Sequence, residues 1–458
     1  MKEKSEKQDI DTLVADQKRY FSDGHTRDVG ARIDAMRRLE NTLVLRRDDI
    51  LSALSKDLGK PGMEAFLAEY FFLLQEVRMI RKSLKKWLKV RRVSSPVYFK
   101  PCRNEIRYEP FGVVLIMSPW NYPVQLSLSP LLAAVAAGNT VILKPSEMAP
   151  ASEQLLCEIT RACFPPEYVS VVTGDAGVAA ELLDQRFDFI FFTGSTAIGK
   201  VVAAKAAEHL TPTVLELGGK CPCVVERSAD IGLSARRILA GKFFNGGQTC
   251  FAPDYVVVHE DVMEPLMEAI KALVETVPWS EEMARVVNQC HYDRLQRLLV
   301  ETQVIKHGED DPESLRMAPR IVLDAAWGDP VMQEEIFGPI LPVIPFSDTS
   351  ELIGRMSDYG LPLALYIFCK NDAFAEELMG SVRSGGVCIN DTMKQGSQLN
   401  VPFGGVGESG HGRYRGKAGV DAFSYERVVV KRGTWGVKWF DLIPPYGDTL
   451  KWFKRLMR

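Results

Sequence analysis

One of the nine cysteines ends an unusual run of residues. The stretch FFNGGQTC, Phe243–Cys250, places Cys250 after Asn, Gly, Gly and Gln, where nothing predicts core packing. A thiol acts as a nucleophile in its thiolate form, which requires a lowered pKa and an approachable position. Gly246 and Gly247 would let backbone approach a ligand and leave space around the sulfur. Taken alone, the octamer is more typical of a glycine turn before a buried cysteine than of a reactive thiol.

Three further stretches carry residues that could assist such a thiol. In LELGGK, Glu216 lies between apolar residues at the end of a strand-like run, a partly desolvated setting that suits a general base. In SPWNYP, Asn121 is a neutral amide donor that could stabilise an oxyanion. EEIFGP supplies Glu335 and Phe337 in a turn, where a capping carboxylate and a core aromatic are the plainer interpretations.

The elements around these stretches predict an α/β fold. Apolar runs at 113–117, 140–144, 170–174 and 187–195 alternate with loops and helical segments, which is typical of a buried parallel sheet with crossover helices. Such a doubly wound domain binds ligands beyond the carboxyl ends of its strands. The pattern restarts at Thr213 and continues to Asn390, which predicts a second α/β unit with a ligand cleft between the two. Residues 33–79 have the periodicity of long amphipathic helices.

Composition narrows the class of protein. The chain has 458 residues, 46% hydrophobic and 25% charged, with a net charge of -3, which predicts a globular protein and gives no reason to expect a nucleic-acid partner. The N-terminal stretch lacks the apolar core of a signal peptide, so we expect a cytoplasmic location. The odd cysteine count favours a reducing compartment. The pair Cys221 and Cys223 lacks the further ligands of a zinc site, so no metal is predicted.

Seven motifs together carry a family resemblance. PWNYP, LKPSE, FTGSTAIGK, LELGGK, FFNGGQTC, EEIFGP and PFGGVGESG occur in the order and at about the spacing found in the aldehyde dehydrogenase superfamily, and they cover nearly the whole chain. Within it the sequence resembles the class 3 branch of fatty and aromatic aldehyde dehydrogenases. FAPDY follows the cysteine, and IPPY follows the PFGGVG region.

The resemblance implies a catalytic role for three residues. Cys250 matches the nucleophile that attacks the aldehyde carbonyl to give a thiohemiacetal, whose oxyanion Asn121 and the Cys250 N–H would hold. Hydride would then pass to the nicotinamide ring, and Glu216 would activate the water that hydrolyses the thioester to a carboxylic acid. Attack by the thiol comes first because an aldehyde has no good hydride to give until its carbon is tetrahedral. The implied substrates are medium- or long-chain aliphatic and aromatic aldehydes.

The resemblance also implies a set of cofactor-binding residues. The hexapeptide GSTAIG would place Gly194, Ser195 and Gly199 against the pyrophosphate at a helix N-terminus. Lys144 and Glu147 match contacts to the adenosine ribose, and Glu147 favours NAD over NADP, although Lys144 could pair with an extra phosphate or be a surface lysine. The other predicted cofactor residues are Trp120, Leu217, Gly218, Glu335 and Phe337.

The family fold implies a division of the chain into parts. We expect a Rossmann-like NAD(P)-binding domain at 1–88 and 109–212, and a catalytic domain at 213–395. Residues 89–108 and 396–432 would form a bridging arm and the return to the cofactor domain. The strand-like segments 105–110 and 423–432 in this arm predict a homodimer.

The remaining tail, 433–458, is basic and aromatic. From Lys431 onward the chain holds seven Lys or Arg and two Asp, but it lacks the apolar length of a membrane span. Such a tail could lie on an anionic lipid surface, or its aromatic residues could pack onto the same chain or a dimer partner.

Two other functions stay open on the same scaffold. Coenzyme A or phosphate could resolve the thioester in place of water, although Glu216 argues against this because acylating relatives typically lack that base. A non-catalytic relative would have no physical reason to keep Cys250, Glu216 and Asn121 together.

Overall fold

The structure of the protein is a computed structural model that describes residues 9–96, 99–279, 281–299, 303–323, 325–434, 444 and 446–456. The chain divides into two compact units. The larger comprises Met1–Trp87 and Pro110–Ser424, and the smaller comprises Leu88–Glu109 and Tyr425–Arg458. Within the part of the chain that the structure describes, no helix is long and apolar enough to cross a membrane.

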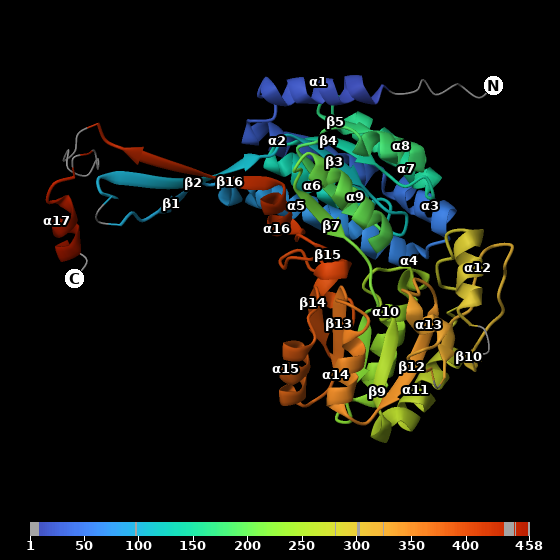
Figure 1. Ribbon diagram of the computed structural model, residues 1–458. Helices are drawn as coiled ribbons and strands as arrows, with labels where there is room; N and C mark the ends of the chain where they lie inside the picture. The colour runs from blue at the N-terminus through green and yellow to red at the C-terminus, as the bar shows by residue number, and fades with distance from the viewer. Residues whose placement is uncertain are drawn as a thin grey trace, which may run out of the picture. The chain divides into compact units, whose positions relative to one another are not determined.

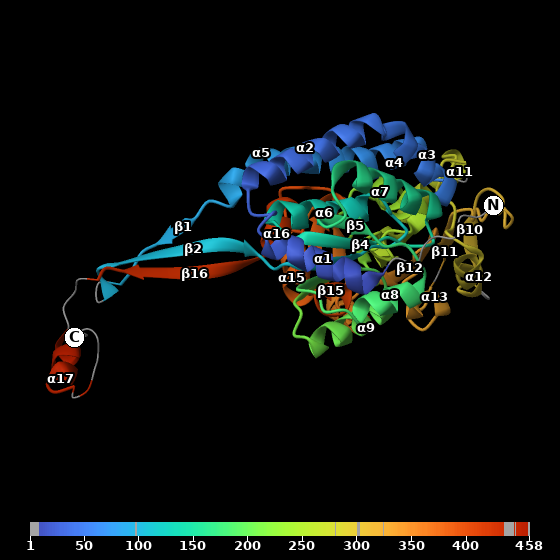
Figure 2. The ribbon, with the colours of Figure 1, turned by 90° about the horizontal axis from the view of Figure 1, so that it is seen from above.

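The first sheet of the larger unit has six strands in the order β15-β7-β6-β3-β4-β5 (Figures 1 and 2). All neighbours are parallel except β15, which is antiparallel to β7. Its strands are β3 (Val113–Met117), β4 (Thr140–Lys144), β5 (Val169–Val171), β6 (Phe189–Thr193), β7 (Thr213–Glu216) and β15 (Gly410–His411). Chain order reverses between β3 and β6, so the crevice beyond their carboxyl ends is where a doubly wound sheet binds ligands.

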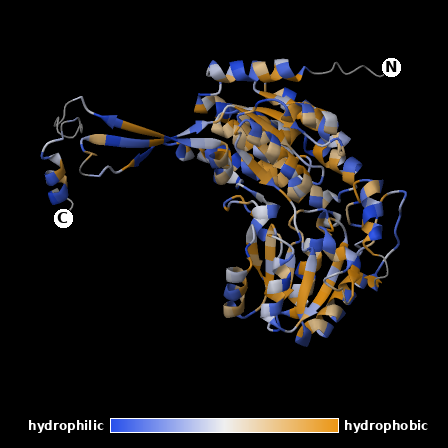
Figure 3. Ribbon diagram, viewed as in Figure 1, coloured by the Kyte–Doolittle hydropathy of each residue, from blue (hydrophilic) through white to orange (hydrophobic). Residues whose placement is uncertain are grey.

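Helices cover both faces of this sheet because its strands are apolar on both sides (Figure 3). One face packs on α1 (Ile10–Ser22), α8 (Ala176–Leu183) and α9 (Thr196–Glu208), which share one buried core cluster with it. The other face packs on α6 (Gln125–Ala137). Three further helices pack against α6, namely α2 (Val29–Leu45), α5 (Phe72–Trp87) and α16 (Gly416–Ala422). Beside them lie α3 (Arg47–Leu58), α4 (Gly62–Ala65) and α7 (Pro150–Cys163). Between α4 and α5 the chain forms a π-helix, η1 (Phe66–Phe71).

The second sheet has seven strands in the order β10-β11-β12-β9-β8-β13-β14, parallel except for β10. They are β8 (Pro222–Val225), β9 (Tyr255–His259), β10 (Val304–Lys306), β11 (Arg320–Val322), β12 (Ile340–Phe346), β13 (Ala364–Phe368) and β14 (Gly386–Ile389). Its helices are α10 (Ile231–Phe243), α11 (Met263–Thr276), α12 (Gln289–Arg297), α13 (Pro330–Gln333), α14 (Thr349–Ser357) and α15 (Asp372–Ser381).

The expectation of two parallel sheets is confirmed, but one strand belongs elsewhere. The sequence predicts that the second unit begins at Thr213, whereas β7 pairs with β6 through Ile190–Thr213 and Thr193–Glu216 and so belongs to the first sheet. The sequence pattern cannot decide which sheet β7 joins, because a short apolar strand has the same pattern in either sheet. The chain enters the second sheet only after Glu216, which leaves that carboxylate at the carboxyl edge of the first.

The smaller unit contains a three-stranded sheet, β1-β2-β16. Its strands are β1 (Arg91–Val93), β2 (Cys102–Pro110) and β16 (Ser424–Arg432), so the expected strands at 105–110 and 423–432 are confirmed. Residues 396–424 belong to the larger unit, not to this sheet. Helix α17 (Thr449–Leu456) lies in the basic tail, of which 435–443, 445, 457 and 458 are outside the described residues.

Candidate active site

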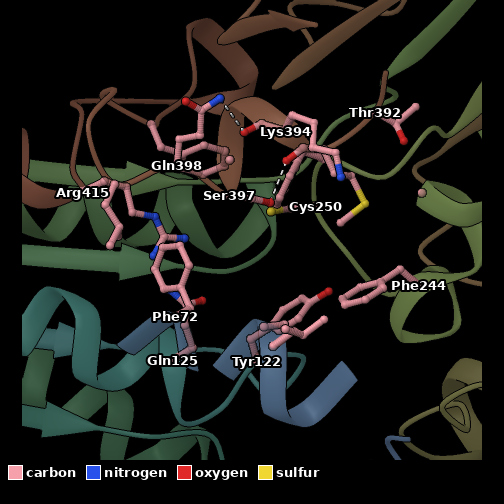
Figure 4. Close-up of a pocket in the computed structure, with 18 of the residues that line it drawn as sticks. Phe72, Tyr122, Gln125, Phe244, Cys250, Thr392, Lys394, Ser397, Gln398 and Arg415 are labelled. Carbon is pink, nitrogen blue, oxygen red and sulfur yellow. Dashed lines mark hydrogen bonds between the residues drawn. The ribbon is translucent and has the colours of Figure 1, made fainter. Parts of the chain in front are cut away.

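Cys250 and Glu216 line one large cavity in the larger unit. The cavity has a volume of about 1070 Å³. Cys250 reaches it from the loop between η3 (Phe244–Gly247) and β9, whereas Glu216 comes from the end of β7. Figure 4 shows Cys250 amid the labelled lining side chains, with Phe72, Tyr122 and Phe244 among them. The structure therefore brings the predicted nucleophile and the predicted base together.

The glycines before the cysteine lie close to neighbouring backbone. Asn245, Gly246 and Gly247 have successive φ values of 56°, 62° and 74°, all in the left-handed region that favours glycine. A Cβ on Gly246 would lie 2.7 Å from the Ala284 carbonyl oxygen, and one on Gly247 would lie 2.2 Å from that of Gly338. The missing side chains thus admit neighbouring backbone, and the expected space around the sulfur stays a prediction.

A hydrogen-bond network fixes Asn121 to the cysteine loop. Its Nδ2 donates to the backbone oxygen of Gln248 at 3.0 Å, two residues before Cys250. In return, Asn245 Nδ2 donates to the Asn121 carbonyl at 3.0 Å and to the Gln248 carbonyl at 3.1 Å. The Tyr122 hydroxyl lies 2.6 Å from Thr249 Oγ1. Hydrogen bonds therefore join the loop after β3 to the loop before β9, which carries Cys250.

Glu216 is a buried carboxylate without a partner. Its residue is 3% exposed, and neither Oε1 nor Oε2 has a hydrogen-bond partner among the described residues. Burial raises the pKa of Glu216 well above its ordinary value, and the guanidinium groups of Arg415 and Arg413 oppose that shift. Unsatisfied buried carboxylates are costly and therefore rare in stable cores. A buried carboxylate with a raised pKa beside a cavity is a feature that concentrates at functional sites.

The thiol is not pre-ionised in the protein alone. Burial raises the pKa of Cys250, and the Glu335 and Glu216 carboxylates act in the same direction, whereas Arg415 favours the thiolate. The lowered pKa that a thiolate nucleophile needs is thus absent here. Arg415 itself is 5% exposed and lies between the rings of Phe72 and Tyr414, 4.5 Å from each centroid.

The GSTAIG segment forms the turn from β6 to α9 at the point where strand order reverses. Ser195 is the N-cap of α9, and its Oγ accepts a 3.4 Å hydrogen bond from the Ile198 N–H. A Cβ on Gly199 would lie 2.6 Å from Leu217 Cδ2, so glycine lets α9 pack closely on the segment after β7. A capped helix N-terminus beside a switch point fits the pyrophosphate of a dinucleotide. Gly194 donates its N–H to the Glu216 carbonyl at 3.0 Å.

The other predicted cofactor residues form two groups. Lys144, at the end of β4, pairs with Glu147 at 2.8 Å, and Lys144 is buried whereas the Glu147 side chain is 43% exposed. In the second group, the rings of Trp120 and Phe337 meet edge to face at 5.4 Å. The Glu335 carboxylate lies against Gly218, where a Cβ would be 2.0 Å from Oε2. Burial and the neighbouring Asp254 carboxylate raise the pKa of Glu335 to about 8.

Comparison with known proteins agrees with this arrangement. Residues 2–429 match the model of the aldehyde dehydrogenase family. The chain belongs to the aldehyde dehydrogenase family. It is 37% identical to the 4,4'-diaponeurosporen-aldehyde dehydrogenase of Staphylococcus aureus, over 98% of this chain and 99% of that one. It is 40% identical to aldehyde dehydrogenase family 3 member H1 of Arabidopsis thaliana, over 93% and 90% of the two chains.

Solved structures show the same fold. A substrate-bound state of AldH from Staphylococcus aureus superposes with a TM-score of 0.95 at 36% identity, covering 98% of this chain and 99% of that one. An NAD-dependent aldehyde dehydrogenase from Sinorhizobium meliloti gives a TM-score of 0.86 at 25% identity, covering 95% and 89%. This aldehyde dehydrogenase is therefore an oxidoreductase that acts on aldehydes with a nicotinamide cofactor, and the predicted family and fold class are confirmed.

The sequence analysis missed a buried ion pair behind the site of this aldehyde dehydrogenase. Lys60 Nζ lies 2.5 Å from Glu69 Oε1, and both side chains are fully buried. Lys60 also donates to the Asn121 carbonyl at 3.0 Å, while Glu69 Oε2 accepts the N–H groups of Val124 and Gln125 at the start of α6. The one available signal was a Glu inside the apolar stretch EAFLAEYFF.

No metal site was predicted. Across the described ranges, no group of three or more His, Cys, Asp or Glu side chains is arranged to hold a metal ion. Cys221 and Cys223 are both buried, and burial raises the pKa of each thiol well above its ordinary value.

Proposed function

We propose that this aldehyde dehydrogenase oxidises an aldehyde to a carboxylic acid through a covalent intermediate on Cys250, with water as the final acyl acceptor. The observation that carries the proposal is Glu216, whose two buried oxygens lack partners while facing the cavity that Cys250 lines. A base with raised proton affinity is suited to activate water near neutral pH. That base is what separates hydrolysis from transfer of the acyl group to a thiol such as coenzyme A.

The residues divide the work as follows. Cys250 Sγ forms a bond to the aldehyde carbon, and the thiol proton passes to water, so that Glu216 stays free to act as a base in the later step. The Asn121 amide and the Cys250 N–H stabilise the oxyanion that forms. A bound nicotinamide cofactor supplies the hydride acceptor. Glu216 then takes a proton from water as the water oxygen attacks the thioester carbon, and the C–S bond breaks to release the acid.

The walls of the cavity favour an apolar substrate. Its volume of about 1070 Å³ lies at the upper end of the usual range for ligand sites. The apolar and aromatic side chains that line it are Leu67, Phe71, Phe72, Leu126, Phe244, Phe251, Met393, Leu399, Phe403 and Tyr414. Medium- or long-chain aliphatic aldehydes, or aromatic ones, suit this lining. The Staphylococcus aureus relative is named for 4,4'-diaponeurosporen-aldehyde.

Two positions bear on the choice of cofactor. Glu147, at the adenosine side, would accept a hydrogen bond from a ribose 2'-hydroxyl and repel a 2'-phosphate, which makes NAD the first choice. Its partner Lys144 provides a positive charge that could instead pair with the phosphate of NADP. The proposed contacts elsewhere are Gly194, Ser195, Gly199, Leu217 and Gly218 for the pyrophosphate side, and Trp120, Glu335 and Phe337 for the nicotinamide ribose and ring.

The test is rapid-mixing absorbance at the reduced-nicotinamide band, with NAD or NADP and aldehydes from acetaldehyde to hexadecanal. Cys250→Ala should abolish reduction, whereas Cys290→Ala, which changes an exposed cysteine, should match wild type. Glu216→Gln should give a burst of reduced cofactor followed by slow turnover. No reduction with any aldehyde discards the proposal, and full turnover by Glu216→Gln shows that another group activates the water.

The three-stranded sheet supports a homodimer. A sheet of three strands buries little apolar surface by itself, and Val428 and Val430 of β16 are 65% and 59% exposed. An exposed apolar strand of this kind is typical of a surface that pairs with a second copy. Light scattering should give twice the mass of the chain, and Val428→Lys with Val430→Lys should lower it. A monomeric wild type contradicts this part of the proposal.

A further inference from the structure

Three charged side chains hold the loop that carries Glu335 and Phe337, and the proposed chemistry uses none of them. The loop joins α13 to β12 and spans residues 334–339. Its backbone enters no regular ladder until Ile340. Charged groups from three other segments bind its backbone instead, and these are Lys220, Asp254 and Arg294.

Lys220 and Asp254 bind the loop from the segments that flank β8 and β9. Lys220 Nζ donates to Asp254 Oδ2 at 2.5 Å, to the Val331 carbonyl at 3.1 Å and to the Glu334 carbonyl at 2.9 Å. Asp254 Oδ1 accepts the N–H of Ile336 at 3.0 Å. Both charged side chains are buried, so these hydrogen bonds are shielded from water and correspondingly strong.

Arg294, from α12, binds the loop with a fork of donors. Its Nη1 donates to Glu334 Oε1 at 2.8 Å and to the Glu335 carbonyl at 3.2 Å, and its Nη2 donates to the Ile336 carbonyl at 2.6 Å. Three consecutive carbonyls, 334 to 336, therefore accept from a cation, and the N–H of Ile336 is taken by an anion. This fixes the loop backbone on both sides of Glu335.

The fixed backbone keeps the next residue in a strained conformation. Phe337 has a φ of 49°, in the left-handed region that is rare and strained for an aromatic residue. That conformation directs its ring against Trp120, while Glu335 lies against Gly218. Strained residues persist only where their surroundings over-determine them, and they concentrate at functional sites.

We propose that Arg294, Lys220 and Asp254 are positioning residues that hold Glu335 and Phe337 in the conformation that receives the nicotinamide riboside end of the cofactor. The inference rests on the proposed function, which places Glu335 and Phe337 against that end. None of the three needs to touch the cofactor. Arg294 gives the cleaner test because Lys220 and Asp254 form a buried pair whose loss would destabilise the whole chain.

The experiment is calorimetric titration of NAD into the full chain without aldehyde, followed by steady-state kinetics. Arg294→Met should raise the Kd and KM for NAD about tenfold by letting the loop shift, and leave the KM for aldehyde within about twofold. Arg294→Lys keeps the charge but not the fork and should fall in between. Arg297→Met, on the same helix and exposed, should equal wild type. A purely structural role would lower the melting temperature of Arg294→Met and leave its NAD affinity unchanged, which overturns the inference.

Glu335→Gln separates this inference from the function beneath it. If Glu335→Gln alters NAD affinity or the rate of hydride transfer and both Arg294 variants bind NAD as wild type does, the positioning role fails alone. If Glu335→Gln and Phe337→Leu both leave NAD affinity and kcat unchanged, the assigned cofactor role of the loop fails first. If Arg294→Met does not fold, the NAD affinity of Arg294→Lys, which preserves the charge, tests the positioning role instead.

Discussion

Replacing Gly247 by alanine measures how tightly the cysteine loop is packed. Its φ of 74° would cost an alanine about 1–2 kcal/mol. The new Cβ would also stand 2.2 Å from the Gly338 carbonyl oxygen, a backbone atom that cannot rotate away, and overpacking of that kind costs about 1–3 kcal/mol. We therefore expect a loss of about 2–5 kcal/mol in the free energy of unfolding. Because Gly338 follows Phe337, NAD affinity should fall as well.

The assay is urea unfolding followed by fluorescence, with the free energy taken from the shift in midpoint. Gly354→Ala is the matched control, since Gly354 lies in α14 and a Cβ there meets nothing within 4 Å. It should stabilise the protein by about 0.5–1 kcal/mol, the usual gain for alanine in a helix. If Gly247→Ala unfolds at the wild-type midpoint, the close approach of the Gly247 and Gly338 backbones is refuted. The role left for the glycines would then be to keep space open around the thiol.

Three further predictions concern the charges and the tail. The pKa of Glu335 is raised from 4.5 to about 8, so its contribution to stability is full below pH 4.5 and is lost as the pH rises through 8. The urea midpoint of wild type, measured relative to that of Glu335→Gln, should therefore fall between these two pH values. A difference in midpoint that does not change with pH contradicts this prediction. Glu69→Gln should destabilise the protein by about 3–5 kcal/mol, because it leaves Lys60 buried without its counter-ion. In the same unfolding assay, the control Glu158→Gln removes one partner of a surface ion pair and should cost under about 1 kcal/mol. The full chain should co-sediment with anionic vesicles and a chain truncated at Lys431 should not, since the tail is basic and aromatic; equal binding by both removes the lipid-surface hypothesis.

The first sheet was predictable because its strands are apolar on both faces. VVLIM and TVILK coincide with β3 and β4 residue for residue, since a fully buried strand is a continuous apolar run with polar breakers at its ends. The membership of β7 was not predictable. It depends on pairing with β6, which lies about twenty residues earlier, and local pattern carries no information about the partner of a strand.

The chemistry of the site was predictable from residue type, but its environment was not. A Cys, a Glu and an Asn in glycine- and proline-rich stretches predicted Cys250, Glu216 and Asn121, and the structure places Cys250 and Glu216 in one cavity and binds Asn121 to the loop before Cys250. The raised pKa of Cys250 could not be foreseen, because it arises from burial and from two carboxylates distant in sequence. The π-helix η1 was equally hidden, since a shift in hydrogen-bond register leaves the apolar spacing helical.

The hydrogen bonds between loops indicate where this enzyme can vary and where it cannot. Asn121 is bonded to the cysteine loop through Gln248 and Asn245, so its side-chain amide cannot move without that loop. Leu67 and Phe71 of η1 also line the cavity, and they are 48% and 42% exposed. Substitutions there should alter which aldehyde fits without displacing the reacting groups. We therefore expect different segments of the chain to determine substrate preference and chemistry. Substitutions can then change which aldehyde fits while the reacting groups stay in place.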